Sequence, residues 1–338
     1  MSDKRIKPYI GITIGDLNGI GPEVIIKALS AQKILDFFNP VIYGSGKVIS
    51  YYRKLLDLND FNFAQIKDEQ LIPKRVNVVN CWQDNFEIKP GFGDEESGKF
   101  AFLALKRACE DLKSQKIHAM VTGPINKEKM PREEFNSVGH TEFISSFFEV
   151  KETLMFLVSE QTRVGLVTGH IPLKDVAMKI TKSGIESKLR VMEKSLINDF
   201  GISKPRIAVL GLNPHAGENG LLGVEENNII SPVIKDFKEH GKLVFGPFPG
   251  DGFFGSGQYV QYDGVLAMYH DQGLIGFKTI AFGSGVNFTA GLGVIRTSPD
   301  HGTAYSIAGK NKADESSMRA AMMLAYDIAL RRFEMVEN

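Results

Sequence analysis

Cysteine is scarce in this sequence, because its 338 residues include only two, Cys81 and Cys109. Two cysteines cannot build a disulfide framework or a zinc site made of thiolates alone, so we expect a reduced, cytoplasmic setting. An excess of positive charge is also lacking, since 40 Lys and Arg balance 40 Asp and Glu. Proteins that bind duplexes carry a basic excess that neutralises phosphates, so nucleic acid is not an expected partner.

A long apolar run is missing as well. Residues 1–15 carry charges and have no apolar core of the signal-peptide type. The uncharged stretch 279–295 contains four glycines together with Thr, Ser and Asn, whereas a membrane span is predominantly apolar over about 20 residues. We therefore expect no membrane partner.

Short apolar runs that alternate with amphipathic stretches are what the sequence does contain. The runs predicted to be buried strands are 9–15, 40–45, 75–80, 117–123, 154–159, 163–169, 206–213 and 263–270. Between them, apolar residues in 101–112 and 185–200 recur at intervals of three or four, as on one face of a helix. This alternation predicts an α/β fold with a largely parallel sheet that is covered on both faces.

Three predicted strands have a histidine at their end or within the next two residues, namely His170, His215 and His270. Ligands of α/β folds bind beyond the carboxyl ends of the strands. Three imidazoles can hold a zinc-like divalent ion and leave coordination positions open, although three separately hydrogen-bonded histidines would also explain the pattern. Asp251 and Asp271 are candidates for fixing an imidazole tautomer or moving a proton.

A cationic segment follows His270 and Asp271. Lys278, Asn287 and Arg296 occur at intervals of nine residues, with no other charge between the two cations. The glycines in this segment would let the backbone approach a ligand closely. Lys and Arg suit a phosphate or carboxylate, so the segment predicts an anionic substrate, with ordinary surface cations as the alternative.

Two further segments are rich in glycine. "GDLNGIGPEVIIKAL" (15–29) follows a strand and opens a helix with Pro22 at its start, but it lacks the GxGxxG order. An anion site at a helix N-terminus and a tight strand-to-helix turn explain it equally well. "SPDHGTAYSIAGKNKADESS" (298–317) is more specific, since a capped helix start explains only part of it.

The order of these motifs resembles one known family. The chain is similar to the 4-hydroxythreonine-4-phosphate dehydrogenases, within the isocitrate and 3-isopropylmalate dehydrogenase-like superfamily. The matching segments lie between residues 15 and 314 and are "GDLNGIGPEV", "VTGPINK", "GHTEF", "GHIPL", "LNPHAGENG", "AMYHDQGL", "GSGVNFTAGL", "IRTSPDHGTA" and "GKNKAD". In this chain "GDLNG" replaces the commoner Gly-Asp-Pro-Ala-Gly, without removing a functional residue.

The resemblance implies roles for named side chains. It implies one divalent metal ion per site (zinc, magnesium or cobalt) held by His170, His215 and His270. The substrate contacts that it implies come from His140, Thr141, Lys278, Asn287 and Arg296. The site that it implies for NAD, with NADP as a possibility, lies near the loop that contains His301, Gly302, Thr303, Ala304 and Asp314.

The resemblance also implies the architecture. We expect two α/β/α domains of the isocitrate/isopropylmalate dehydrogenase-like type, with the active site in the cleft between them. The expected first domain comprises residues 1–135 plus 297–338, and the second comprises 136–296. A homodimer with shared active sites is expected, in which His270 completes a site whose His170 and His215 belong to the partner chain.

The reaction implied is the NAD-dependent oxidation of 4-phosphooxy-L-threonine to 2-amino-3-oxo-4-phosphooxybutanoate. This product decarboxylates to 3-amino-2-oxopropyl phosphate in pyridoxal phosphate biosynthesis. Asp251, Asp271 and Lys278 all qualify by residue type as the general base. Dehydrogenation of 4-phospho-D-threonate or 4-phospho-D-erythronate in sugar-acid catabolism is the alternative. A metal-dependent hydrolase of a phosphorylated compound would also fit three histidines and an anion pocket.

Overall fold

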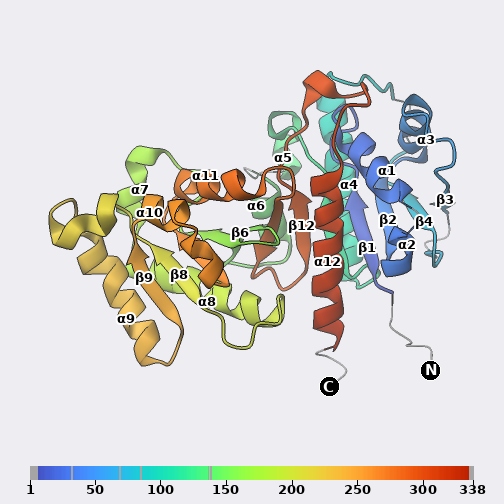
Figure 1. Ribbon diagram of the computed structural model, residues 1–338. Coiled ribbons are helices and arrows are strands. Elements are labelled where there is room, and N and C mark those ends of the chain that lie inside the picture. Colours follow the sequence, from blue (N-terminus) through green and yellow to red (C-terminus); the bar gives the residue numbers. More distant parts are fainter. Residues whose placement is uncertain are drawn as a thin grey trace. The chain divides into compact units, whose positions relative to one another are not determined.

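The computed structural model describes residues 7–31, 33–67, 70–83, 86–135, 137 and 139–334. Residues 1–6, expected not to belong to a signal peptide, and residue 136 at one predicted domain boundary lie outside them. The chain divides into two compact units (Figure 1): unit 1 comprises the described residues up to Val150 and Gly293–Phe333, and unit 2 comprises Lys151–Leu292. The predicted boundaries at 135/136 and 296/297 stay a prediction.

The strands of unit 1 form a parallel sheet in the order β3-β4-β2-β1-β5-β12. They are β1 (Tyr9–Thr13), β2 (Asn39–Gly44), β3 (Phe63–Ile66), β4 (Val76–Asn80), β5 (Ala119–Thr122) and β12 (Arg296–Pro299). The helices are α1 (Gly21–Ser30), α2 (Ile34–Phe37), α3 (Gly46–Leu55), α4 (Glu95–Lys113), α5 (Arg132–Phe135), α6 (His140–Phe147) and α12 (Ser316–Glu334), with the short turns η1 (Lys127–Lys129) and η5 (Tyr305–Ile307).

Helix α4 shows how the sequence of unit 1 specifies its fold. Asp94 and Ser97 form a capping box at its start: Asp94 Oδ1 accepts from Ser97 N at 2.8 Å, and Ser97 Oγ accepts from Asp94 N at 3.2 Å. Its apolar face, predicted from the spacing in 101–112, packs on β1, β2 and β5. Strand β1 beneath it is buried from Ile10 to Thr13, as expected for a parallel sheet.

The strands of unit 2 follow the order β11-β6-β7-β10-β8-β9. They are β6 (Leu154–Val158), β7 (Arg163–Leu166), β8 (Ile207–Leu210), β9 (Val244–Phe248), β10 (Gly264–Ala267) and β11 (Val286–Ala290). The helices are α7 (Leu173–Lys179), α8 (Lys182–Asn198), α9 (Ser231–Glu239), α10 (Gly250–Gly255) and α11 (His270–Ala281), with the short turns η2 (Pro214–Gly220), η3 (Glu226–Ile230) and η4 (Gln258–Gln261).

Helices α8 and α11 cover opposite faces of the sheet in unit 2 (Figure 1). Val164 and Leu166 of β7 face Gly273 of α11, whereas the intervening Gly165 faces Met192 of α8. Alternate residues of a strand point to opposite faces, so both faces of β7 are buried. The side chains beneath α11 form a continuous apolar core that reaches from Leu157 to Ala281.

The predicted α/β class is confirmed, but the sheet of unit 2 is mixed. β6 pairs antiparallel with both β7 and β11, while β7, β10, β8 and β9 are parallel neighbours. Only a tight turn joins β6 to β7, closed by a hydrogen bond from Ser159 N to Thr162 O of 2.9 Å. A connection this short can join only antiparallel strands, since a parallel crossover needs a dozen or more residues.

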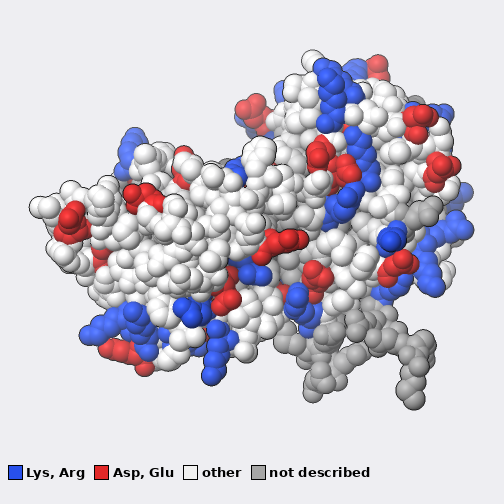
Figure 2. Space-filling model, in the orientation of Figure 1, with Lys and Arg blue, Asp and Glu red and all other residues white. Residues whose placement is uncertain are grey.

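The two cysteines are free thiols, Cys81 half-buried and Cys109 buried. Burial raises the pKa of each thiol to about 12, so both stay protonated at neutral pH. Among the described residues, no helix is long and apolar enough to cross a membrane. Figure 2 shows charges of both signs interspersed on one face of the molecule and largely uncharged surface over α10 and α11.

Candidate active site

The three strand-end histidines follow three adjacent strands of unit 2. His170 lies in the loop after β7, His270 is the first residue of α11 after β10, and His215 lies in η2 after β8. Because β7, β10 and β8 are parallel neighbours, their carboxyl ends meet at the same edge of the sheet. The sequence thus placed all three imidazoles correctly beyond one edge, where α/β folds bind ligands.

Hydrogen bonds beyond the last strand residues hold His170 near His270. The backbone N–H groups of Val167 and Thr168 donate to Ala267 O and Met268 O at 2.9 and 3.1 Å, and Thr168 Oγ1 donates to Met268 O at 2.8 Å. The pairing of β7 with β10 is thereby extended toward the loops. The imidazole centroids of His170 and His270 lie 5.3 Å apart, with the rings tilted by 46°.

The pair His270–Asp271 orients one imidazole. His270 Nδ1 lies 2.7 Å from Asp271 Oδ1, in a hydrogen bond whose polarity depends on the tautomer. A carboxylate in this position favours the Nδ1–H tautomer, which leaves Nε2 with a lone pair that can bind a metal. This contact explains why an imidazole and a carboxylate follow directly at the end of β10.

Gln272, which the sequence did not single out, joins two of the strand ends. Its Oε1 accepts from Met268 N at 2.7 Å, and its Nε2 donates to Gly211 O at 2.6 Å. These bonds tie the end of β10 to the end of β8, and so fix the segment with His270 against the segment with His215. An amide residue in the first turn of a helix gives no sequence signal of such a role.

The fit of these residues to a metal ion rests on their donor chemistry. Three imidazoles are a common ligand set for zinc and related ions. Within the described part of the chain, however, no three His, Cys, Asp or Glu side chains are spaced as a metal-binding group. The structure therefore brings His170 and His270 together in one chain and does not bring His215 into a chelating group with them.

A second group of predicted residues lies in unit 1. Arg296, the first residue of β12, is only 3% exposed, and its Nε and Nη2 donate to Thr122 Oγ1 at 3.1 and 2.6 Å. Burial lowers the pKa of Arg296 to about 10, against the opposing effect of the Glu142 carboxylate, so the guanidinium remains charged at neutral pH. The two hydrogen bonds to Thr122 fix the orientation of this guanidinium.

His140 begins α6 and belongs to the same group. Its Nε2 atom is buried and has no hydrogen-bond partner among the described residues. Burial, and then the charges of Arg296 and Lys127, hold the pKa of His140 well below its ordinary value, so the imidazole is neutral at pH 7. Thr141 follows in the first turn of the helix, half-exposed. An unpaired buried nitrogen beside a buried cation suits an anionic ligand.

Lys278 and Asn287 belong to unit 2 and come from different elements. Lys278 lies in the last turn of α11, and Asn287 lies in β11, where its buried Oδ1 has no partner among the described residues. The predicted substrate residues are therefore divided between the units: His140, Thr141 and Arg296 in unit 1, and Lys278 and Asn287 in unit 2.

The predicted cofactor loop packs against the start of α1. Thr303 O accepts from Ile20 N at 3.0 Å, and Ala304 has a φ of 42° in the left-handed region. His301 directs Nδ1 to Gly302 O at 3.1 Å, while its Nε2 is buried without a partner among the described residues. A buried orphan nitrogen beside exposed Gly302 fits a polar cofactor such as NAD.

Asp314, also predicted to bind the cofactor, caps a helix. It accepts from Ser316 N at 2.7 Å at the start of α12, and hydrogen bonds from the Ser316 side chain and backbone lower its pKa. The buried Asp16 is the residue of this region that the sequence analysis missed. Its carboxylate accepts from Tyr305 Oη, Ser97 Oγ and Asn18 N at 2.6, 3.0 and 2.9 Å.

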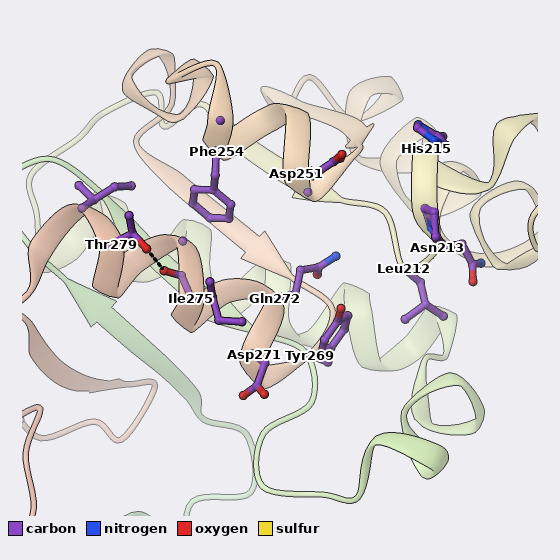
Figure 3. Close-up of a pocket in the computed structure, with 15 residues that line it drawn as sticks. Leu212, Asn213, His215, Asp251, Phe254, Tyr269, Asp271, Gln272, Ile275 and Thr279 are labelled. Carbon is purple, nitrogen blue, oxygen red and sulfur yellow. Dashed lines mark hydrogen bonds between the residues drawn. The ribbon is translucent and has the colours of Figure 1, made fainter.

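A cavity of about 640 Å³ lies within unit 2, between η2, α10 and α11 (Figure 3). His215, Asp251 and Asp271 line it, so two of the three candidate bases reach the same space. In Figure 3, Phe254 extends from α10 toward α11, while Asp251 and Asp271 do not point toward one another. The cavity is therefore a candidate for the region where a proton is removed from a ligand near His215.

Comparisons with known proteins identify the class. The family described as "Pyridoxal phosphate biosynthetic protein PdxA" matches residues 36–325, and this chain belongs to that family. A protein of Bacteroides thetaiotaomicron named 4-hydroxythreonine-4-phosphate dehydrogenase is 48% identical over 334 residues, 98% of this chain and 91% of that protein. The fold also matches a crystal structure of 4-hydroxythreonine-4-phosphate dehydrogenase from Klebsiella pneumoniae, with a TM-score of 0.81, 35% identity and coverage of 97% and 100%.

A relative with a different name is similar over nearly the same length of this chain. A protein of Pectobacterium atrosepticum named D-threonate 4-phosphate dehydrogenase is 37% identical over 327 residues, 95% of this chain and 99% of that protein. The family resemblance read from the sequence motifs is thus confirmed.

Proposed function

We propose that this protein is a 4-hydroxythreonine-4-phosphate dehydrogenase. It oxidises 4-phosphooxy-L-threonine with NAD to 2-amino-3-oxo-4-phosphooxybutanoate, which decarboxylates to 3-amino-2-oxopropyl phosphate in pyridoxal phosphate biosynthesis. The observation that carries this proposal is the 48% identity to a protein of that name over nearly the whole chain. We place the reaction in the cytoplasm, without nucleic-acid or membrane partners.

The phosphate-binding step uses the cationic residues. Arg296, held by Thr122, and Lys278 supply positive charge, and the Asn287 amide supplies a hydrogen bond. Two cations with a planar guanidinium suit a phosphate dianion. Neutral His140 and Thr141 add hydrogen bonds without further charge. Because these residues belong to both units, the expected position of the active site between the units stays a prediction.

The chemical step removes a hydride and a proton from the substrate. The C3–H bond breaks and its electron pair passes to NAD, while the proton of the C3 hydroxyl passes to a base, for which Asp251, Asp271 and Lys278 are the candidates. His170, His215 and His270 would hold a divalent ion (zinc, magnesium or cobalt), which supplies Lewis-acid polarisation of the hydroxyl when bound. Residues 301–304 and Asp314 would contact NAD, or NADP.

The active form that we propose is a homodimer. Large apolar side chains of unit 2 are exposed near the candidate site, including Leu221 (79%), Ile275 (67%) and Phe282 (89%). The surface over α10 and α11 is also largely uncharged (Figure 2). Exposed apolar surface of this kind marks contacts between protein chains, and most soluble oligomers consist of identical chains.

The test of this function is a direct assay. Purified protein with 4-phosphooxy-L-threonine, NAD and a divalent ion should produce NADH absorbance, and a chelator should abolish it. NADH production that continues undiminished in verifiably metal-free protein would contradict the metal-dependent reaction.

Oxidation of 4-phospho-D-threonate or 4-phospho-D-erythronate is the second candidate, supported by the relative named D-threonate 4-phosphate dehydrogenase. These sugar acids carry a hydroxyl in place of the substrate amine, so the same phosphate and hydroxyl contacts serve both. Comparing kcat/KM on the three substrates distinguishes the candidates. A higher value on either sugar acid would reassign the protein to sugar-acid catabolism.

A further inference from the structure

The backbone that carries His215 has an unusual conformation. Five consecutive residues of η2, from His215 to Asn219, have positive φ values of 52°, 51°, 78°, 42° and 55°. Only Gly217 among them lacks a β-carbon, and each of the others is sterically disfavoured in this region. A run of such residues persists only where the surrounding structure holds it, and strain of this kind collects at functional sites.

A buried carboxylate holds the base of this left-handed turn. Glu226 is 2% exposed, and its Oε1 accepts from the backbone N–H groups of Leu212 and Asn213, both at 2.7 Å. Its Oε2 accepts from Asn213 Nδ2 at 2.9 Å. These partners are the residues between β8 and the left-handed turn. Glu226 itself begins η3, a π-helical turn, a distortion that is frequent at functional sites.

The carboxylate and the turn are packed closely at Gly217 and at Gly211, and Gly211 also lies against Ala216. A β-carbon added to Gly217 would lie 2.6 Å from Glu226 Oε2, and one added to Gly211 would lie 3.1 Å from Oε1. Gly217 is also the middle residue of the left-handed run. The position of Glu226 therefore determines how the turn can be packed.

The chemistry of the contacts requires a carboxylate at position 226. All three hydrogen-bonding partners of Glu226 are donors: two backbone N–H groups and an amide NH₂. A carboxylate accepts on both oxygens, whereas a glutamine of the same shape would present its own NH₂ to one of these donors. The neighbouring Glu225 differs, since its Oε2 accepts from Asn213 Nδ2 at 2.8 Å and it does not contact the two backbone groups.

We propose that Glu226 is a positioning residue for His215: its buried carboxylate fixes the left-handed turn and thereby sets the affinity of the site for a divalent ion. This inference rests on the metal-dependent function proposed above. It assigns to Glu226 no contact with the ion or the substrate. Its effect passes through the backbone of Leu212 and Asn213 to the imidazole of His215.

The test compares Glu226→Gln with Glu225→Gln as a matched control. Both variants lose one carboxylate beside Asn213, but only the first disturbs the backbone N–H groups. Zn²⁺ and Co²⁺ titrated into metal-free protein by calorimetry should bind Glu226→Gln about 10- to 100-fold more weakly than wild type. Glu225→Gln should stay within about threefold. The Kd for NAD should be unchanged in both, which a general loss of structure would not allow.

A polarity-reversed variant keeps the proposal testable if Glu226→Gln folds poorly. In Asn213→Asp/Glu225→Gln/Glu226→Gln, the amide NH₂ groups of residues 225 and 226 donate to a carboxylate at 213, so the two side-chain hydrogen bonds are retained in reverse. The carbonyl oxygen of the glutamine at 226 still accepts from the two backbone N–H groups. Its metal affinity should return to within about threefold of wild type. Wild-type metal affinity in Glu226→Gln, or a weak affinity in the folded triple variant, would overturn the positioning role. Absence of metal binding by wild type would instead refute the metal-dependent function and this role together.

Discussion

The guanidinium of Arg296 is held in one orientation by Thr122, and it is buried away from water. Its two bonds to Thr122 Oγ1 orient the guanidinium before any ligand arrives. We predict that Arg296→Ala raises the KM for the phosphorylated substrate strongly, since losing a buried charged partner costs about 2 to 5 kcal/mol. Steady-state kinetics with NAD saturating measure this. Thr122→Val is the matched control and should give a smaller rise, and an unchanged KM in Arg296→Ala would exclude a phosphate contact.

His140 should make the stability of the protein depend on pH. Its folded-state pKa lies well below the ordinary value of 6.5, so the unfolded chain binds a proton more readily. The stability contributed by neutral His140 is therefore present above about pH 6.5 and is lost as the pH falls toward the folded-state pKa. Between pH 7.5 and 5, wild type should therefore lose more free energy of unfolding than His140→Gln. Urea denaturation at both pH values measures the difference, and equal losses would contradict a buried neutral imidazole.

At the scale of elements, α1 fastens the cofactor loop at two places. In the loop before α1, Asp16 Oδ2 accepts a hydrogen bond from the Tyr305 hydroxyl at 2.6 Å. One turn into the helix, Glu23 Oε1 accepts from Ala313 N at 3.0 Å, and Lys27 Nζ donates to Ala313 O at 2.9 Å. Both ends of the segment that contains residues 303–313 are thus held by one helix and the turn that precedes it.

Tyr305→Phe should loosen one of these attachments. The buried Asp16 carboxylate would lose a donor, which costs about 1 to 3 kcal/mol. We predict a Kd for NAD about 10-fold higher, with the KM for the phosphorylated substrate unchanged, as fluorescence titration and steady-state kinetics would show. Ser306→Ala, beside it and exposed, is the control. If Tyr305→Phe bound NAD as tightly as wild type, this attachment of the loop would not contribute to cofactor binding.

The same elements show what the sequence could reveal. Strand ends and the motif order placed the three histidines at neighbouring positions, because parallel strands share a carboxyl edge. Asp16, Glu226 and Gln272 were not predicted, since each acts through backbone groups distant in sequence. Strands β3, β9, β11 and β12 were also missed, because polar residues, glycine or proline interrupt their apolar runs.

At the scale of the whole molecule, subunit mixing tests the shared site. If ligands come from two chains, mixing inactive His215→Ala with inactive His270→Ala should restore activity to about a quarter of wild type, because random exchange makes half the dimers mixed and each has one intact site. NADH assays after confirmed exchange measure this. No recovery would place His215 and His270 of a site in one chain.

A second subunit mixture tests whether His170 and His270 of one metal site come from the same chain or from different chains. His170 and His270 of one chain lie with ring centroids 5.3 Å apart, whereas the expected arrangement assigns them to different subunits. Mixing His170→Ala with His270→Ala should restore about a quarter of the activity if they come from different chains. If both come from one chain, this mixture stays inactive although the first recovers, and the expected assignment of His270 is wrong.

Unit 1 is discontinuous, since the chain leaves it after Val150 and returns at Gly293. On the ribosome, this order has a consequence: unit 2 is complete and free to fold while unit 1 still lacks β12 and α12. A chain that stops before residue 293 would carry all three strand-end histidines but neither Arg296 nor the cofactor loop. Premature termination should therefore yield a folded fragment that cannot turn over substrate, because roughly the last seventh of the chain completes unit 1.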